Sequence, residues 1–101
     1  MRVRLTAFAK QELLRVHRYY ETKSPGLGDR FLDEVARTLQ LIKEYPHLWT
    51  KMGRTARRCR LNRFKYGVLY RAYDDHIVVF IIGHLSRRPS FWRKLIKLAE
   101  K

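Results

Sequence analysis

Arginine, lysine and tyrosine side chains, together with one histidine, are the groups of this sequence that could do chemistry. They gather in the second half of the chain and are interleaved with apolar residues. Guanidinium groups hold phosphate or carboxylate through forked hydrogen bonds, and tyrosine rings stack on bases or on guanidinium planes. The pattern therefore indicates a surface for an anionic partner. Its residues are Arg57, Arg58, Arg60, Arg63, Lys65, Tyr66, Tyr70, Arg71, Tyr73, His84, Arg87 and Arg88.

His84 is the one well-placed candidate for proton transfer. A metal-independent ribonuclease could use it with Arg71 and Tyr73, because a cation stabilises the phosphorane while His or Tyr moves protons during attack by a 2′-hydroxyl. The competing interpretation is structural: the histidine would hydrogen bond at the end of a strand and hold it against Arg87 or the closing helix. A lone histidine is weak evidence for catalysis, so the structural role is favoured.

Other kinds of catalytic or binding site find little support in the sequence. The four histidines are scattered, and one cysteine, Cys59, cannot make a structural zinc site. We find no Gly-rich phosphate loop and no nucleophile elbow. The adjacent Asp74 and Asp75 are assigned to a turn, where aspartate is common because it hydrogen bonds locally. We therefore expect no metal and no cofactor.

The formal charge of +14 is unevenly distributed. Residues 45–101 carry fourteen Lys and Arg against three Asp and Glu, whereas residues 1–44 carry nine against six. Such a field attracts nucleic acid, an acidic protein segment or an anionic membrane surface, and the alternative is a merely soluble basic surface. The start of the chain does not resemble a signal peptide, no apolar run is long enough to span a membrane, and a single cysteine fits the reducing cytoplasm. We expect a cytoplasmic protein without membrane contact.

Three consecutive strands over residues 57–89 must position the basic surface. Ile77–Ile82 is an unbroken apolar run rich in β-branched residues, which is typical of a central strand covered on both faces. Residues 68–73 alternate as a neighbouring strand does, and Asp74 and Asp75 join the two. Residues 58–62 alternate as a third strand with a strongly basic face. Residues 46–56 show no period and are predicted to be a surface loop.

The first half of the chain is predicted to cover this sheet. Residues 2–5 suit a short strand, and Thr6 can cap the helix that follows. In that helix an apolar stripe runs from Ala9 to Tyr20. Ser24 with Pro25 is then predicted to begin a second helix, which stops near Pro46. A short amphipathic helix over residues 91–99 closes the chain. We expect one α+β domain, residues 1–101, in the order β-α-α-β-β-β-α, with an N-terminal helical hairpin packed on a mostly antiparallel sheet.

A series of short motifs follows in a fixed order along nearly the whole chain. They are Leu5-Thr6-x-x-Ala9, Tyr19-Tyr20, Arg30-Phe31, Tyr45-Pro46, Arg57-Arg58, Phe64-x-Tyr66, Leu69-x-x-x-Tyr73 and His84-x-x-Arg87-Arg88-Pro89-x-x-Trp92. In their order and spacing, these motifs resemble the RelE/ParE superfamily of toxins from bacterial type II toxin–antitoxin modules. The expected family fold agrees with the one that periodicity predicts. Lys65 departs from the family, which often has proline there.

The resemblance implies a cognate antitoxin with an acidic C-terminal segment, bound in a hetero-oligomer, and one of two targets. RelE-like members cut mRNA on the ribosome, whereas ParE-like members bind DNA gyrase. The ending from His84 to Trp92 is closer to ParE, so a gyrase poison is favoured over a ribonuclease. A third alternative is a non-toxic basic module that binds nucleic acid. The residues expected to bind target or antitoxin are Arg57, Arg58, Arg60, Arg63, Tyr66, Arg71, Arg87, Arg88 and Trp92.

Overall fold

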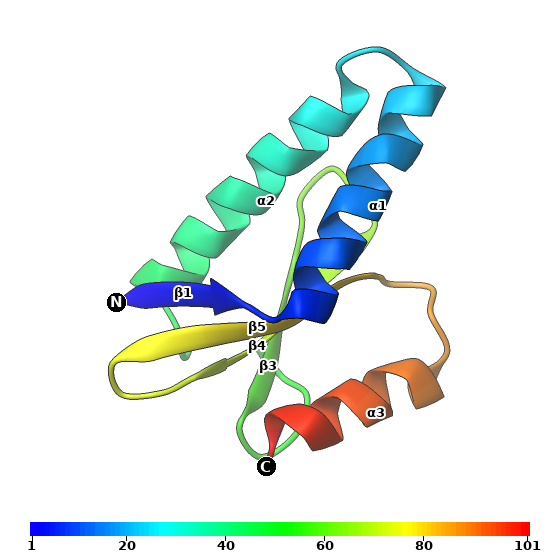
Figure 1. The fold of residues 1–101 in the computed structure, drawn as a ribbon. Helices are drawn as coiled ribbons and strands as arrows, with labels where there is room; N and C mark the ends of the chain where they lie inside the picture. The colour runs from blue at the N-terminus through cyan, green and yellow to red at the C-terminus, as the bar shows by residue number, and fades with distance from the viewer.

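A five-stranded sheet forms the centre of the computed structural model, which describes residues 1–101 (Figure 1). Its strand order is β1-β5-β4-β3-β2; β1 runs parallel to β5, and the other neighbours are antiparallel. This confirms the predicted α+β class with one added strand. The elements are β1 (Arg2–Leu5), α1 (Ala7–Lys23), α2 (Leu27–Glu44), β2 (Thr50–Lys51), β3 (Ala56–Arg60), β4 (Tyr66–Ala72), β5 (His76–His84) and α3 (Pro89–Ala99).

The added strand, β2, lies within residues 46–56, where the sequence predicted only a loop. It is two residues long and pairs with Arg57 and Arg58 of β3. A pattern of alternating residues cannot be recognised over two positions, so the prediction of an unstructured loop was wrong at this point. The predicted turn at Asp74 and Asp75 is confirmed, and the Tyr73 amide donates to the carbonyl of His76 across it at 2.8 Å.

The helical hairpin forms as expected, except at the start of its second helix. Thr6 caps α1 and accepts a hydrogen bond from the Ala9 amide at 3.1 Å. Ser24, predicted to begin α2, instead ends α1, and Gly26 occupies the N-cap of α2 with a φ of 85°. The chain reverses within three residues, which requires a left-handed residue that glycine adopts without steric cost. The Glu21 carboxylate replaces the missing cap by accepting from the amides of Gly26 and Asp29.

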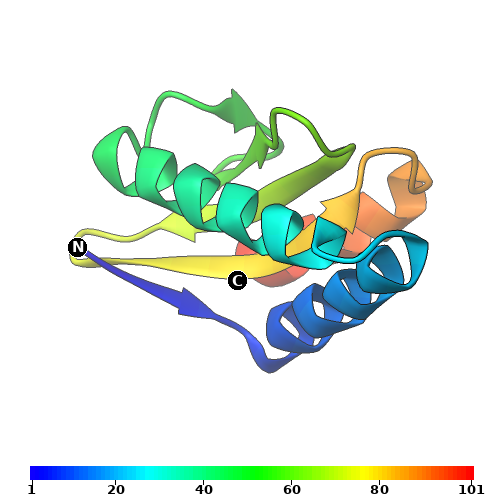
Figure 2. The ribbon, with the colours of Figure 1, turned by 90° about the horizontal axis from the view of Figure 1, so that it is seen from above.

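The sheet is covered on both faces, by different helices. The hairpin of α1 and α2 lies on one face, and α3 lies on the other (Figure 1). Seen from above, α1 and α2 lie over the sheet and partly hide α3 behind it (Figure 2). The larger core, under the hairpin, contains Phe31, Val68 and Val79, while the smaller one, under α3, contains Leu69 and Ile81. The predicted central, doubly covered strand is confirmed, and no helix is long and apolar enough to cross a membrane.

The substitution Phe31→Ala is predicted to lower the free energy of unfolding by about 3 to 5 kcal/mol, because it empties a fully buried site. The Phe31 ring packs against those of Tyr20, Phe64 and Tyr66, at centroid distances of 5.3 to 5.4 Å. Chemical denaturation would measure the change. Leu41→Ala, on the exposed side of the same helix, is the control and should change stability by no more than about 0.5 kcal/mol. Equal effects of the two substitutions would contradict the core assignment.

Candidate functional site

The three residues proposed for a ribonuclease site lie at two ends of the sheet. His84 ends β5, whereas Arg71 and Tyr73 lie beside the turn that begins it. At about 3.3 Å per residue, the eight steps from His76 to His84 span about 26 Å. Near the turn, the rings of Tyr73 and His76 stack with their centroids 4.8 Å apart. The Arg71 guanidinium carbon lies 4.5 Å from the Tyr73 ring centroid. The structure therefore does not bring His84 together with Arg71 and Tyr73.

His84 instead faces Tyr66, its partner in the β4–β5 register. The two rings meet edge to face at 5.0 Å. The Ser86 amide donates to Nδ1 of His84 at 3.0 Å, and the Ser86 hydroxyl lies 2.6 Å from the same nitrogen. Because Nδ1 accepts, a neutral ring carries its hydrogen on Nε2. Burial raises the pKa of Tyr66, and the charges of Arg15 and Arg87 only oppose that shift, so its hydroxyl keeps its proton near neutral pH.

Several residues predicted to bind a partner hold α3 against the sheet. The Arg71 guanidinium donates to the Ala99 carbonyl at 3.0 Å, where the C-terminal end of a helix favours a positive charge. The Arg58 guanidinium lies 4.8 Å from the Trp92 ring centroid, and its burial lowers its pKa, with a smaller contribution from Arg60. The Trp92 side chain is part of the smaller core and is only 5% exposed. These contacts leave Trp92 little surface with which to meet a partner.

Of the other residues predicted to bind a partner, some make contacts within the fold and some have exposed side chains. The Arg57 guanidinium donates to the carbonyl of Trp49, the residue before β2, at 2.9 Å. The Arg63 amide donates to the buried Glu34 carboxylate at 2.7 Å, which fixes the β3–β4 connection, while the Arg63 side chain is exposed. Exposed cations remain at Arg60, Arg63, Arg87 and Arg88. The Arg87 guanidinium lies 4.6 Å from the Phe91 ring centroid.

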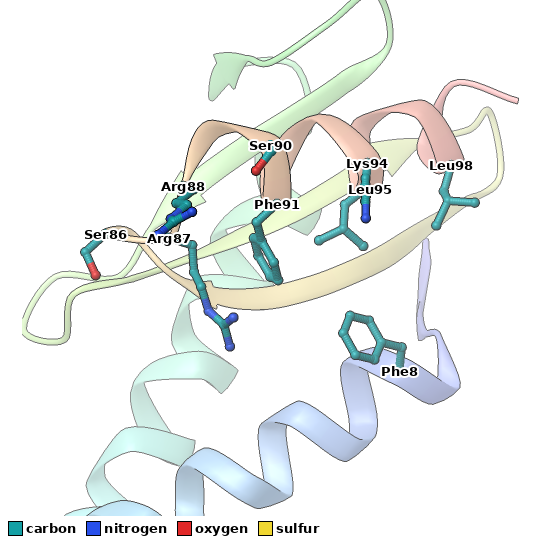
Figure 3. Close-up of a pocket in the computed structure, with 9 residues that line it drawn as sticks. All are labelled: Phe8, Ser86, Arg87, Arg88, Ser90, Phe91, Lys94, Leu95 and Leu98. Carbon is teal, nitrogen blue, oxygen red and sulfur yellow. The ribbon is translucent and has the colours of Figure 1, made fainter.

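A groove between α1 and α3 is the feature that the sequence did not predict (Figure 3). Its volume is about 770 Å³, and its apolar lining consists of Phe8 from α1 and of Phe91, Leu95 and Leu98 from α3. Phe8 is 44% exposed and Leu98 is 54% exposed. Both lie outside the apolar stripes that assign the core, and large apolar residues off the stripe are the signal that could have indicated this surface. The basic and polar lining comprises Ser86, Arg87, Arg88, Ser90 and Lys94.

Glu100, the residue after α3, links the end of that helix to the loop between β2 and β3. Its carboxylate accepts from the amides of Arg54 and Thr55, each at 2.6 Å, and from the Thr55 hydroxyl. These hydrogen bonds, led by that of the Thr55 hydroxyl, lower the pKa of Glu100 to about 2. They fasten the end of α3 to the loop between β2 and β3.

One group of residues has the composition of a metal site, in the helical hairpin. Ligand atoms of His17, Glu21 and Asp29 lie within 4.8 Å of one another. His17 Nε2 lies 3.0 Å from the Asp29 carboxylate, and Glu21 accepts from backbone amides of the turn. The polar atoms of this cluster are thus already used to join α1 to the start of α2, and they account for its geometry without an ion.

Two comparisons place the chain among known proteins. Residues 3–89 match the family described as ParE toxin of type II toxin-antitoxin system, parDE. The fold is similar to a chain of the solved structure of the chromosomal ParDE toxin–antitoxin system from P. aeruginosa, with a TM-score of 0.66 and 14% identity, over 83% of this chain and 95% of that one. Comparison with curated proteins gave no match. The structural likeness shows a ParE-like fold, and the family match covers most of the sequence. This chain belongs to the ParE family of type II toxins.

The difference in stability between the wild type and Glu100→Gln is predicted to depend on pH. A carboxylate whose pKa is about 2 in the folded chain and ordinarily 4.5 stabilises the fold above pH 4.5 and loses that contribution as pH falls toward 2. Thermal unfolding of both proteins from pH 7 to pH 2 would show the gap between them shrinking over this interval. Glu44→Gln, at an exposed residue, is the control. A gap that stays constant across the range would contradict the Glu100 assignment.

Proposed function

We propose that this chain is neutralised by a cognate antitoxin and arrests growth by binding DNA gyrase in the cytoplasm, without cutting nucleic acid itself. The observation that carries the proposal is the separation of the titratable residues. A ribonuclease needs an acid and a base within hydrogen-bond reach of one phosphodiester, beside a cation. Here Arg71 and Tyr73 lie at the far end of the sheet from His84, and the residue beside His84 is a tyrosine, Tyr66, that is only 7% exposed.

Family membership supports the same conclusion, since the matched description is that of a ParE toxin. The charge supports the partner: an acidic antitoxin segment is steered toward a surface of net charge +14, and association is faster at low salt. Of the arginines expected to bind target or antitoxin, Arg57, Arg58 and Arg71 are engaged within the fold. The side chains of Arg60, Arg63, Arg87 and Arg88 are exposed and are therefore the best placed to meet the antitoxin.

The second candidate function is a ribosome-dependent mRNA ribonuclease. One observation favours it: His84 and Tyr66 are in contact, and the charges of Arg15 and Arg87 act on the Tyr66 hydroxyl. A catalytic role would require this tyrosine to become accessible, although it is only 7% exposed. The third candidate, a non-toxic nucleic-acid-binding module, would bind DNA or RNA alone with an affinity that falls steeply with salt.

Brief induction of the chain in bacteria is predicted to stop thymidine incorporation first, while methionine incorporation continues. A toxin that stalls gyrase blocks replication before it affects translation. Pulse labelling with both precursors would measure the order, and purified gyrase should then accumulate cleaved DNA in the presence of the chain. Early loss of methionine incorporation would instead favour the ribonuclease. Growth without arrest would remove the toxin assignment and favour the nucleic-acid-binding module.

The substitution His84→Ala is predicted to leave growth arrest within about twofold of the wild type, because the histidine is held by Ser86 as part of the strand end. Loss of a general acid or base would instead slow a ribonuclease by about 10² to 10⁴-fold. The measurement is the number of survivors after induction at matched protein levels. Ser86→Ala, which removes one contact of the same ring, serves as the structural control. Arrest abolished by His84→Ala but not by Ser86→Ala would contradict the gyrase proposal.

A further inference from the structure

A basic furrow runs along α2, on the side where the connection between β3 and β4 lies against that helix. It consists of two adjoining cavities of about 660 and 420 Å³, which share Glu34, Arg37 and Arg63 in their linings. The Arg63 amide donates to the Glu34 carboxylate at 2.7 Å, so the connection is joined to the helix where the two cavities meet. The fold itself therefore fixes the distance between the two walls of the furrow.

Each wall of the furrow carries two arginines. Arg30 and Arg37 belong to α2 and are seven residues apart, which is about 10 Å and two turns, so both lie on the same face of the helix. Arg60 ends β3, and Arg63 follows in the connection. All four residues are exposed, and only Arg37 forms an ion pair, with Glu34 at 3.9 Å. Three guanidinium groups of this concave surface therefore have no carboxylate partner.

The number and placement of these cations favour a chain of phosphates as the occupant. A guanidinium group matches the geometry of phosphate through two parallel hydrogen bonds. The arginines are spread along about 10 Å of one wall and are repeated on the other, which suits several anionic groups in a row. Asp33 is the one exposed acidic residue of the lining, and it lies in the cavity that Arg30 lines.

The lining offers little to an acidic peptide. Leu41 is its one exposed apolar residue, whereas Cys59 and Leu61 are only 2% and 6% exposed. A peptide that becomes ordered on binding needs apolar anchors to offset its lost conformational entropy. A nucleic-acid strand gains affinity in another way, because its condensed counterions are released when arginines neutralise its phosphates. The exposed amide side chain of Asn62 is a further group that can hydrogen bond to phosphate or sugar.

We propose that this furrow binds the phosphodiester backbone of one nucleic-acid strand. Phosphates pair with Arg30 and Arg37 on one wall and with Arg60 and Arg63 on the other, and such contacts do not depend on base sequence. The binding site goes beyond the proposed function and does not require it. That the strand is DNA held by gyrase does rest on the proposed function. Arg60 and Arg63 are also available to the antitoxin, so an antitoxin that covers them displaces the strand.

Fluorescence anisotropy with labelled single-stranded DNA of about 12 nucleotides measures the affinity of the furrow. Arg37→Ala combined with Arg63→Ala removes one arginine from each wall and should weaken binding by about tenfold or more. The slope of log K against log salt should fall by about 1.4, since each lost phosphate contact accounts for about 0.7. The control, Arg18→Ala combined with Arg54→Ala, removes two exposed arginines outside the furrow and should change the affinity by less than about threefold.

A second pair of substitutions keeps the test independent of the contacts of Glu34. Arg30→Ala combined with Arg60→Ala leaves both of those contacts in place and should weaken binding to a similar extent. Equal losses in the furrow variants and in the control would show that net charge alone governs binding, and the proposal would fail. It would fail equally if polyglutamate of matched charge bound as tightly as the DNA and was lost in the same variants.

The same oligonucleotide made as RNA identifies the source of the strand. A furrow that contacts phosphates alone should bind the DNA and RNA forms with similar affinity, because they differ in backbone only by the 2′-hydroxyl. A preference for one form would support the furrow as a nucleic-acid site and show which strand it takes.

Tryptophan fluorescence tests the place of binding. Trp49 lines the furrow, whereas Trp92 is 5% exposed and belongs to the core under α3. Unlabelled oligonucleotide should quench the emission of the wild type but not that of Trp49→Phe, in which Trp92 is the remaining indole. Quenching that persists in Trp49→Phe would place the strand near α3 and contradict the proposal. A wild type whose emission stays constant at saturation would contradict it as well.

Growth arrest separates this inference from the proposed function. If the wild type binds DNA through the furrow but causes no arrest, the binding site stands and the proposed toxicity fails. If the wild type arrests growth and the furrow variants bind DNA as tightly as it does, the proposed function stands and the furrow proposal fails.

Discussion

The structure depends on one constraint: the pair β4 and β5 is apolar on both faces, so both faces must be covered. Val68, Tyr70 and Val79 require the helical hairpin, and Leu69 and Ile81 require α3. The register shifts between Leu69 and Tyr70, where Ile81 and Val79 are the successive partners and Phe80 is left over as a bulge. Because of the extra residue, Val79 and Ile82 both belong to the core under the hairpin although they are three positions apart, and Ile81 belongs to the core under α3.

The two faces of the sheet are covered by cores of different size. The hairpin brings two long helices to the larger core, whereas α3 contributes three buried residues, Trp92, Leu95 and Ala99. A small core supplies little stabilisation through burial, so polar contacts must assist it. Arg58 on the Trp92 ring, Arg71 on the Ala99 carbonyl and Glu100 on the β2–β3 loop provide these contacts. Arg58 and Arg71, which the sequence analysis assigned to a partner surface, therefore stabilise the packing of α3 on the sheet.

The sequence predicted the elements well and the roles of single side chains poorly, for a physical reason. Periodicity identifies a buried strand such as β5, and capping chemistry identifies Thr6, because both signals are local. The alternation of β3 implies that Arg57 and Arg58 face opposite sides, but only the packed structure shows which contacts each makes. The separation of His84 from Tyr73 follows from the length of β5, and the placement of Phe8 and Leu98 on one groove follows from tertiary packing alone.

Most positive side chains of the folded chain have no carboxylate partner within it. Of twenty-three Lys and Arg residues, only Arg15 and Arg37 form ion pairs with carboxylates, and each pairs with a residue three positions away in its own helix. The remaining cations repel one another, and such repulsion opposes the compact state. A partner that brings carboxylates relieves this repulsion only when it binds the folded chain, so its binding free energy adds to folding stability. The same charge that would attract an acidic segment would therefore make such a complex more stable than the free chain.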